Sequence, residues 1–154
     1  MIRRGVGGVS HDCKLDLVTI RGNLTGDQYI REVLRPVVVP HIDNHPLATR
    51  PEYMDDNARP HRSRAVTAFM RTNAISTIAW PAMSPDLNPI EHLWDILGRR
   101  IQAREPSVQN LQQLEAALHQ EWLQLSQHEI RRLTGSMRRT VECVIRARGG
   151  YTCY

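Results

Sequence analysis

Two acidic residues stand at positions where a carboxylate could be held for chemistry. Asp56 follows the short stretch 53–55 and precedes Asn57, while Glu91 falls in the first turn of a predicted helix. Asn88 is a good N-cap for that helix, and a helix N-terminus favours a negative charge. Carboxylate oxygens are ligands for Mg²⁺ or Mn²⁺. Two such ions, about 3.5–4 Å apart, can activate the nucleophile and stabilise the leaving oxygen in phosphoryl transfer.

Ordinary structural roles are the alternative for these acids and their neighbours. Glu91 could be only a capping charge, and Asp56 only a turn residue. Asp86 is expected to make a local turn hydrogen bond. Asp55 is expected to be a poorer ligand than Asp56, since neighbouring strand residues point to opposite faces. His61 is expected to orient the loop of Asp56. The alternative is that His61 contacts DNA, or that it contacts a residue that binds the metal.

Short stretches that alternate between apolar and polar residues predict the strands that would carry this site. Their composition and turn-like flanks are typical of β-structure. The predicted strands cover residues 6–10, 14–20, 53–55 and 75–80.

The predicted helices are marked by caps and by three-to-four-residue spacing. Thr25 and Gln28 have the spacing of a capping box and open a helix whose apolar face reaches residue 38. Pro36 is expected to kink or end that helix, and residues 41–51 are expected to form a loop. A second helix is predicted over residues 63–72.

The helix capped by Asn88 has a regular apolar stripe, and more helices follow it. We expect the stripe to pack on the sheet, with Arg99 and Arg100 exposed. The order of elements predicts an α/β fold with a mixed sheet flanked by helices, followed by a helical C-terminal tail. The stripe consists of Ile90, Leu93, Trp94, Leu97 and Ile101.

Composition bounds the class of protein. The 154 residues are 41% hydrophobic and contain no apolar run long enough for a membrane span. The basic N-terminus lacks the apolar core of a signal peptide. Three scattered cysteines argue against a disulfide framework or a zinc site and are typical of a reducing compartment.

The charge favours an anionic partner without proving one. The net charge is +4, and Lys14 is the only lysine among 20 basic residues. Arginine binds phosphate bidentately, which lysine cannot do. An equal alternative is that the arginines near the C-terminus only form a solvent-exposed helix face. The candidate DNA contacts are Arg99, Arg100, Arg131, Arg132, Arg138 and Arg139.

Two long sequence words resemble a known family. MDDNARPHRS (54–63) and WPAMSPDLNPIEHLWDILGRR (80–100) are similar to DDE transposases of the Tc/mariner superfamily, in its nematode-type branch. The resemblance implies a ribonuclease-H-like fold in which Asp56 is the second catalytic acid and Glu91 the third. The 34 residues between them match the spacing of this branch. Shorter words, GGVS, IRGNLTGDQYI and ARGGYTCY, extend the resemblance along the chain.

One part of the family pattern has no match. The family's first catalytic Asp lies on the first strand of the sheet, upstream of this sequence, and neither Asp12 nor Asp16 aligns with it. We therefore expect a catalytic core that is incomplete at its N-terminus over residues 1–106, with residues 107–154 as its helical tail. The family's helix-turn-helix modules also have no match.

The resemblance implies a cut-and-paste DNA transposase that uses two Mg²⁺ or Mn²⁺ ions. Its partners would be transposon ends and a TA target, with a homodimer in intact relatives, a nuclear location and no membrane. The chain alone is expected to be inactive because one acid is unmatched. The alternative is a non-catalytic remnant that binds DNA weakly or packs against an intact transposase.

Overall fold

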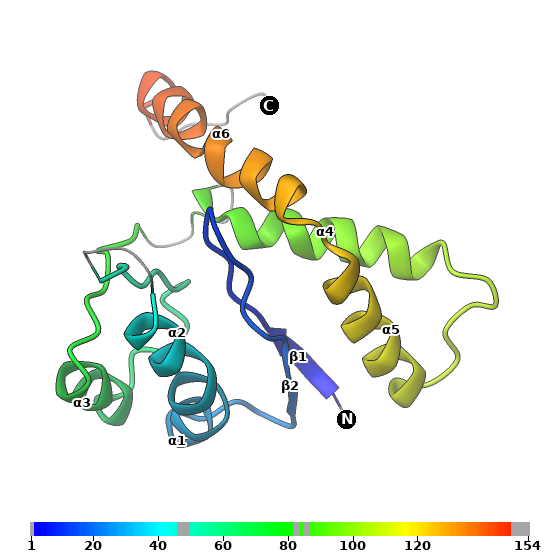
Figure 1. Cartoon of the computed structure of the whole chain (residues 1–154), viewed down its shortest axis with the longest axis horizontal. Helices are drawn as coiled ribbons and strands as arrows, with labels where there is room; N and C mark the ends of the chain where they lie inside the picture. The colour runs from blue at the N-terminus through cyan, green and yellow to red at the C-terminus, as the bar shows by residue number, and fades with distance from the viewer. Residues whose placement is uncertain (1, 46–49, 82–83, 85–86, 149–154) are drawn as a thin grey trace. The chain divides into compact units, whose positions relative to one another are not determined.

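A computed structural model describes residues 2–45, 50–81, 84 and 87–148. The chain divides into two compact units (Figure 1). The first unit contains residues 1–7 and 15–83, and the second contains residues 8–14 and 84–154. No described helix is long and apolar enough to cross a bilayer.

A two-stranded antiparallel sheet opens the first unit. β1 (Ile2–Val6) pairs with β2 (Val18–Arg21), with Val6 opposite Val18. The predictions for strands 6–10 and 14–20 were therefore only partly right: Val6 and residues 18–20 lie in the sheet, and Val9 and Lys14 form an isolated antiparallel bridge. Residues 8–14 instead belong to the second unit, where side chains of a later helix hold them.

Helical segments follow one another without a break from residue 26 to residue 43 (Figure 1). They are α1 (Gly26–Tyr29), the π-helix η1 (Ile30–Val38) and α2 (Val39–Asp43). Pro36 does not end the helix, contrary to one expectation, because the pairing changes to the π type around a residue that has no N–H to donate. The predicted loop at 41 consequently begins three residues too early, because α2 continues to Asp43.

The helix α3 (Arg64–Thr72) is confirmed, and it meets α1 closely. Its N-cap is Ser63, whose Oγ accepts a hydrogen bond from the Val66 N–H at 3.3 Å. A Cβ added at Gly26 would lie 2.1 Å from that Oγ, so only glycine lets the two helices approach this far. The buried core that results comprises Ile20, Tyr29, Val33, Leu34, Val38, Ile42, Val66, Met70 and Ile75.

The predicted strands 53–55 and 75–80 shrink to one parallel bridge between Tyr53 and Thr77. The Tyr53 N–H donates to the Ser76 carbonyl at 2.8 Å, and the Ile78 N–H donates to the Tyr53 carbonyl at 2.9 Å. This pairing fixes the chain two residues before Asp55.

Three helices form most of the second unit: α4 (Pro89–Gln102), α5 (Leu111–Gln124) and α6 (Gln127–Arg146). Leu93 and Leu97 are fully buried, which confirms the centre of the predicted stripe. Trp94 is only half-buried and stacks on Trp122 of α5, with ring centroids 5.5 Å apart. Within this unit α4 contacts both α5 and α6.

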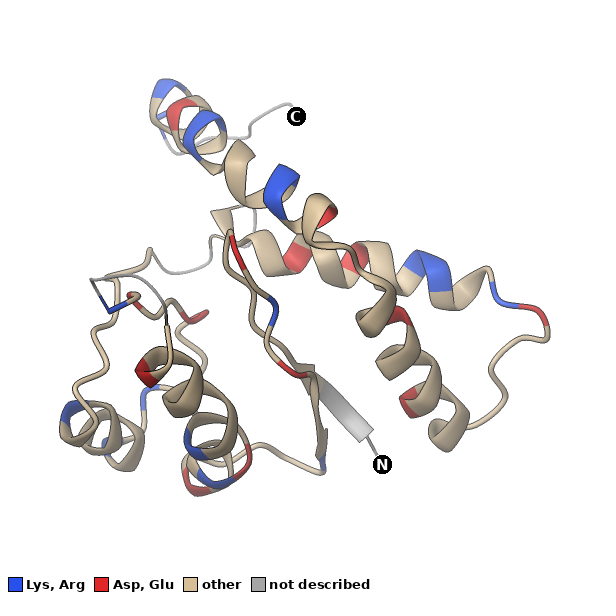
Figure 2. Ribbon diagram, in the orientation of Figure 1, with Lys and Arg blue, Asp and Glu red and all other residues tan. Residues whose placement is uncertain are grey.

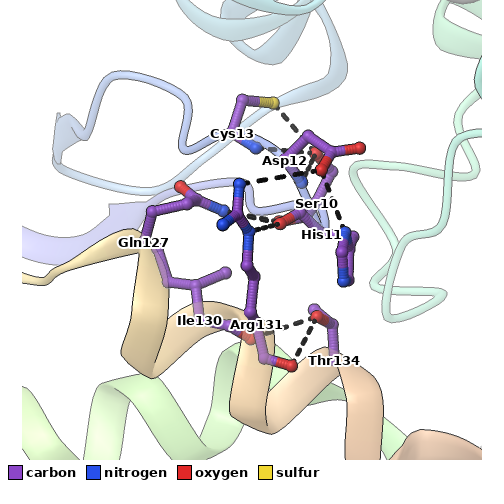
Figure 3. A network of polar contacts seen from close by, with 8 residues as sticks. All are labelled: Ser10, His11, Asp12, Cys13, Gln127, Ile130, Arg131 and Thr134. Atoms are coloured by element: carbon purple, nitrogen blue, oxygen red, sulfur yellow. Dashed lines mark hydrogen bonds and ion pairs between the residues drawn. The ribbon is translucent and has the colours of Figure 1, made fainter.

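The loop 8–14 is fastened to the corner between α5 and α6. The Lys14 ammonium donates to the carbonyls of Leu125 at 2.9 Å and Leu123 at 3.2 Å, near the negative end of α5. Figure 3 shows Gln127 and Arg131 of α6 reaching the same loop, where both donate to the His11 carbonyl. These contacts explain why residues 8–14 leave the sheet.

Candidate metal site

The Asp56 carboxylate is held by a tight turn. Its Oδ1 accepts hydrogen bonds from His61 Nδ1 at 2.8 Å and from the Ala58 N–H at 3.0 Å. The His61 hydrogen bond is the main cause that lowers the pKa of Asp56 to about 2, with the Ala58 N–H acting the same way and burial opposing both. The side chain is 51% exposed. Asp56 therefore offers solvent an ionised and oriented carboxylate.

The two ring nitrogens of His61 differ in their hydrogen bonding. Because a carboxylate only accepts, Nδ1 must carry the proton that it shares with Asp56. In the neutral ring Nε2 then keeps a lone pair, and this atom is buried without a hydrogen-bond partner among the described residues. The ring stacks on Tyr29, with centroids 4.2 Å apart. These contacts hold His61 beside the Asp56 carboxylate, and its supporting role stays a prediction.

Asp55 is an acid of this loop that sequence reasoning set aside. Its side chain is 3% exposed, and Oδ1 lies 3.2 Å from Arg62 and 2.8 Å from the Asn57 N–H. The other oxygen, Oδ2, is buried and has no hydrogen-bond partner within the part of the chain that is described. The strand-alternation argument does not apply to Asp55, because the chain has already left extended pairing and entered the turn.

Asn57 shapes the turn with both its backbone and its side chain. It lies in the left-handed region with φ 58°, which asparagine tolerates better than most residues. Its Nδ2 donates to the Trp80 carbonyl at 3.0 Å, and its Oδ1 accepts from Arg62 Nε at 2.7 Å. The sequence places Asn57 next to Asp56 in the family word, but it gave no sign of Arg62 as the partner of Asn57.

Two tyrosines line the base of this turn. The hydroxyls of Tyr29 and Tyr53 are hydrogen-bonded to each other. Burial raises the pKa of Tyr53 to about 12, and burial likewise raises the pKa of Tyr29, with nearby acids adding to both effects. Both phenols therefore stay neutral beside the acidic loop.

The loop residues suit a divalent cation. Among the described residues, Asp55, Asp56 and His61 each offer one ligand atom, and these atoms lie within 4.8 Å of one another. The buried, unpartnered Oδ2 of Asp55 and Nε2 of His61 are consistent with a cation nearby. Carboxylate oxygens match Mg²⁺ and Mn²⁺, and an imidazole nitrogen is a common ligand of transition metals.

Glu91 is positioned by a helix, as expected. The Oδ1 of Asn88 accepts from the Ile90 N–H at 3.3 Å, and Pro89 occupies the first helical position. Glu91 lies in the first turn and is exposed, while Leu93 of the next turn is fully buried. Asp86 lies outside the described residues.

The structure places these acids in different units. Asp56, Asn57 and His61 come together in the first unit, and Asn88 and Glu91 in the second. The proximity of the Asp56 and Glu91 carboxylates stays a prediction.

The six candidate arginines fall into two groups (Figure 2 shows the charges along the helices). Three are engaged within the second unit: Arg100 with Glu129 at 2.5 Å, Arg131 with the loop at His11, and Arg138 with Glu142 at 3.2 Å. The prediction that Arg100 is exposed was wrong, because the Glu129 pair draws the side chain to 34% exposure. The other three, Arg99, Arg132 and Arg139, are exposed.

Comparisons with known proteins identify the family of this chain. The DDE superfamily endonuclease family matches residues 6–115. The transposable element Tcb1 transposase of Caenorhabditis briggsae is 36% identical over 102 residues, covering 66% of this chain and 37% of the relative. The Tc3 transposase of Caenorhabditis elegans is 32% identical, over 63% of this chain and 30% of the relative. The chain thus spans about a third of the length of these relatives.

Solved structures show the same fold. The catalytic domain of Mos1 mariner transposase has a TM-score of 0.78 at 17% identity, over 96% of this chain and 74% of that one. A Mos1 catalytic domain structure with Raltegravir and Mg has the same TM-score, and the Mos1 paired end complex with Mn has a TM-score of 0.73 over 93% of this chain and 43% of that one. The ribonuclease-H-like fold is confirmed. The family words, the family match and this fold agree: the chain belongs to the DDE endonuclease superfamily and is similar to transposases of Tc/mariner type.

Proposed function

We propose that this chain provides the second and third acids, Asp56 and Glu91, of a site for metal-dependent DNA cleavage and strand transfer. The observation that carries the proposal is the ionised Asp56 carboxylate held by His61 and the Ala58 N–H at the family position. We propose that its DNA substrates are transposon ends and a TA target, that intact relatives act as homodimers, and that the chain works in the nucleus.

Each residue has a distinct task in this proposal. Asp56 holds a metal through a carboxylate that stays charged across the neutral range. His61 fixes the direction of that carboxylate, and Glu91 brings a second carboxylate on a rigid helix. Bound Mg²⁺ or Mn²⁺ would supply charge for the attacking and leaving oxygens of the phosphoryl transfer. The two acids are expected to lie within roughly 4–8 Å of each other if metals about 3.5–4 Å apart span them.

Metal binding gives the direct test. Free Mn²⁺ is measured by electron paramagnetic resonance during titration of the 154-residue chain. Asp56→Asn should weaken binding by at least about tenfold, since even residues behind the ligands change metal affinity by 10–100-fold. Asp27→Asn, which removes an exposed acid of α1 in the same unit, is the matched control and should change little. Equal affinity in all three proteins would overturn the assignment of Asp56 and favour a non-catalytic role.

We further propose that these 154 residues do not cut DNA by themselves. Asp56 and Glu91 can hold one hydrated ion, but a second ion needs further carboxylate oxygens. The test is Mn²⁺-dependent nicking of plasmid DNA by the chain and by Glu91→Gln. Nicking that Glu91→Gln abolishes would contradict this proposal, whereas the same chain with a family-type upstream strand bearing an Asp should nick.

A further inference from the structure

Two arginines on the outer side of α6 have no partner in the second unit. Arg132 and Arg139 are exposed, and neither side chain forms a hydrogen bond or ion pair with any residue that the structure describes. They are seven positions apart, which is close to two full turns and a rise of about 10.5 Å. The two guanidinium groups therefore start from the same side of the helix.

That side is the one turned away from the core of the unit. Arg139 comes nine positions after the fully buried Ile130, which at 100° per residue places it half a turn away. Gly135 lies between the two arginines, and a Cβ at that position would meet nothing within 4 Å. The surface between the arginines is thus open, and bare backbone there permits close approach of another molecule.

Neighbouring arginines of α6 show what an engaged side chain looks like on this helix. Arg138 and Arg146 both pair with Glu142, at 3.2 Å and 3.9 Å. Arg131 donates to the His11 carbonyl (Figure 3). Acceptors within the unit therefore occupy these three side chains, while the side chains of Arg132 and Arg139 have no such acceptor among the described residues.

We infer that Arg132 and Arg139, here called the α6 arginine row, bind the phosphate backbone of double-stranded DNA. A guanidinium offers a planar fork that grips a phosphate bidentately, and a regular polyanion can engage two such forks on one open helix face. Contacts of this kind position a protein on DNA without reading its sequence. The inference rests on the proposed function for the identity of the polyanion, but it needs neither a metal ion nor the two acids.

The salt dependence of binding tests the row. Binding of the full 154-residue chain to a labelled duplex of arbitrary sequence is followed by fluorescence anisotropy in EDTA, between about 50 and 300 mM KCl. Each phosphate contact contributes about 0.9 to the slope of log affinity against log salt concentration. The double variant Arg132→Ala with Arg139→Ala should therefore lower the slope by about 1.8.

The chain supplies a matched control on the same helix. Arg138→Ala with Arg146→Ala removes the same two charges, but from side chains already paired with Glu142. This control should leave the slope nearly unchanged. Arg132→Lys with Arg139→Lys should keep the slope, because the charge is retained, while binding weakens with the loss of the fork.

Each outcome decides the inference. Equal losses of slope in the two alanine double variants would show a general charge effect and would overturn the inference. No loss of slope in either variant, or no DNA binding by the parent chain, would overturn it as well. Circular dichroism checks that each variant is folded. Because binding is measured in EDTA, a lower slope in the row variant supports the row even if the metal-binding test of Asp56 fails, so the two proposals can fail separately.

Discussion

Asp56 and Glu91, the two acids that the family words predict as site residues, are positioned by different kinds of contact. Asp56 sits on an irregular turn whose shape depends on polar contacts from His61, Asn57 and their neighbours. Glu91 sits on a helix whose place depends on an N-cap and on fully buried leucines. Loss of one contact can redirect the first acid without unfolding its unit, whereas the second acid moves only if its helix loses its packing.

The largest effect should come from removing the apolar anchor of Glu91's helix. Leu93 is fully buried, and Leu93→Ala should lower the free energy of unfolding by about 2–5 kcal/mol through lost contacts and a cavity. Chemical denaturation followed by circular dichroism measures this change. Leu123→Ala, at a position 76% exposed, should stay within about 0.5 kcal/mol of the parent chain. Similar costs for both variants would contradict the packing assigned to α4.

A second effect should come from the close approach of α1 and α3 that supports the Asp56 turn. A Cβ at Gly26 would lie 2.1 Å from Ser63 Oγ and 2.9 Å from its Cβ, so the N-cap of α3 must shift. Gly26→Ala should cost about 1–3 kcal/mol, as overpacking does. Gly98→Ala, where a Cβ meets nothing within 4 Å, should instead stabilise α4 by about 0.5–1 kcal/mol. A thermal melt that shows equal shifts would refute the contact.

A smaller effect should follow from changes at Asn57, which separate backbone shape from side-chain contacts. Asn57→Gly keeps the left-handed conformation but loses the bonds to Trp80 and Arg62, and it should cost about 1 kcal/mol. Asn57→Ala loses both bonds and strains the backbone, so it should cost about 1 kcal/mol more. Equal unfolding free energies for the two variants would show that the turn does not depend on positive φ.

Sequence reasoning succeeded where local signals decide the structure. The caps at Thr25 and Asn88 are visible as residue types, and the helices that follow begin directly after them, at Gly26 and Pro89. The family words also predicted Asp56 and Glu91 as site residues, and that assignment stays a prediction. The failures concern long-range contacts, which no local pattern encodes. Residues 8–14 leave the sheet because Gln127, 116 positions after His11, binds them.

The Asp56 turn shows the same limit at the site itself. His61 was expected as a support because it lies in the family word, but the burial of Asp55 follows from its pairing with Arg62. The alternation rule failed there because it assumes an extended strand, and the chain turns at Asn57 instead. A buried acid next to an exposed one is invisible in a sequence until the turn between them is known.

The smallest expected effect is electrostatic: it measures how much the hydrogen bond from His61 lowers the pKa of Asp56. His61→Ala should raise the pKa of Asp56 from about 2 toward its ordinary value of 3.8, because the strongest hydrogen bond to the ionised carboxylate is lost. A depressed pKa contributes stability that is present above the unfolded value and is lost as the pH falls through the folded value. The stability difference between parent and variant should therefore be larger at pH 5 than at pH 2.

Carboxyl-carbon NMR titration gives the pKa of Asp56 directly. His41→Ala, which removes a histidine that contacts His45 instead, should leave the Asp56 titration in place. An unchanged Asp56 titration in His61→Ala would mean that the Ala58 N–H alone holds the carboxylate, and that the turn rather than the histidine keeps this acid ionised.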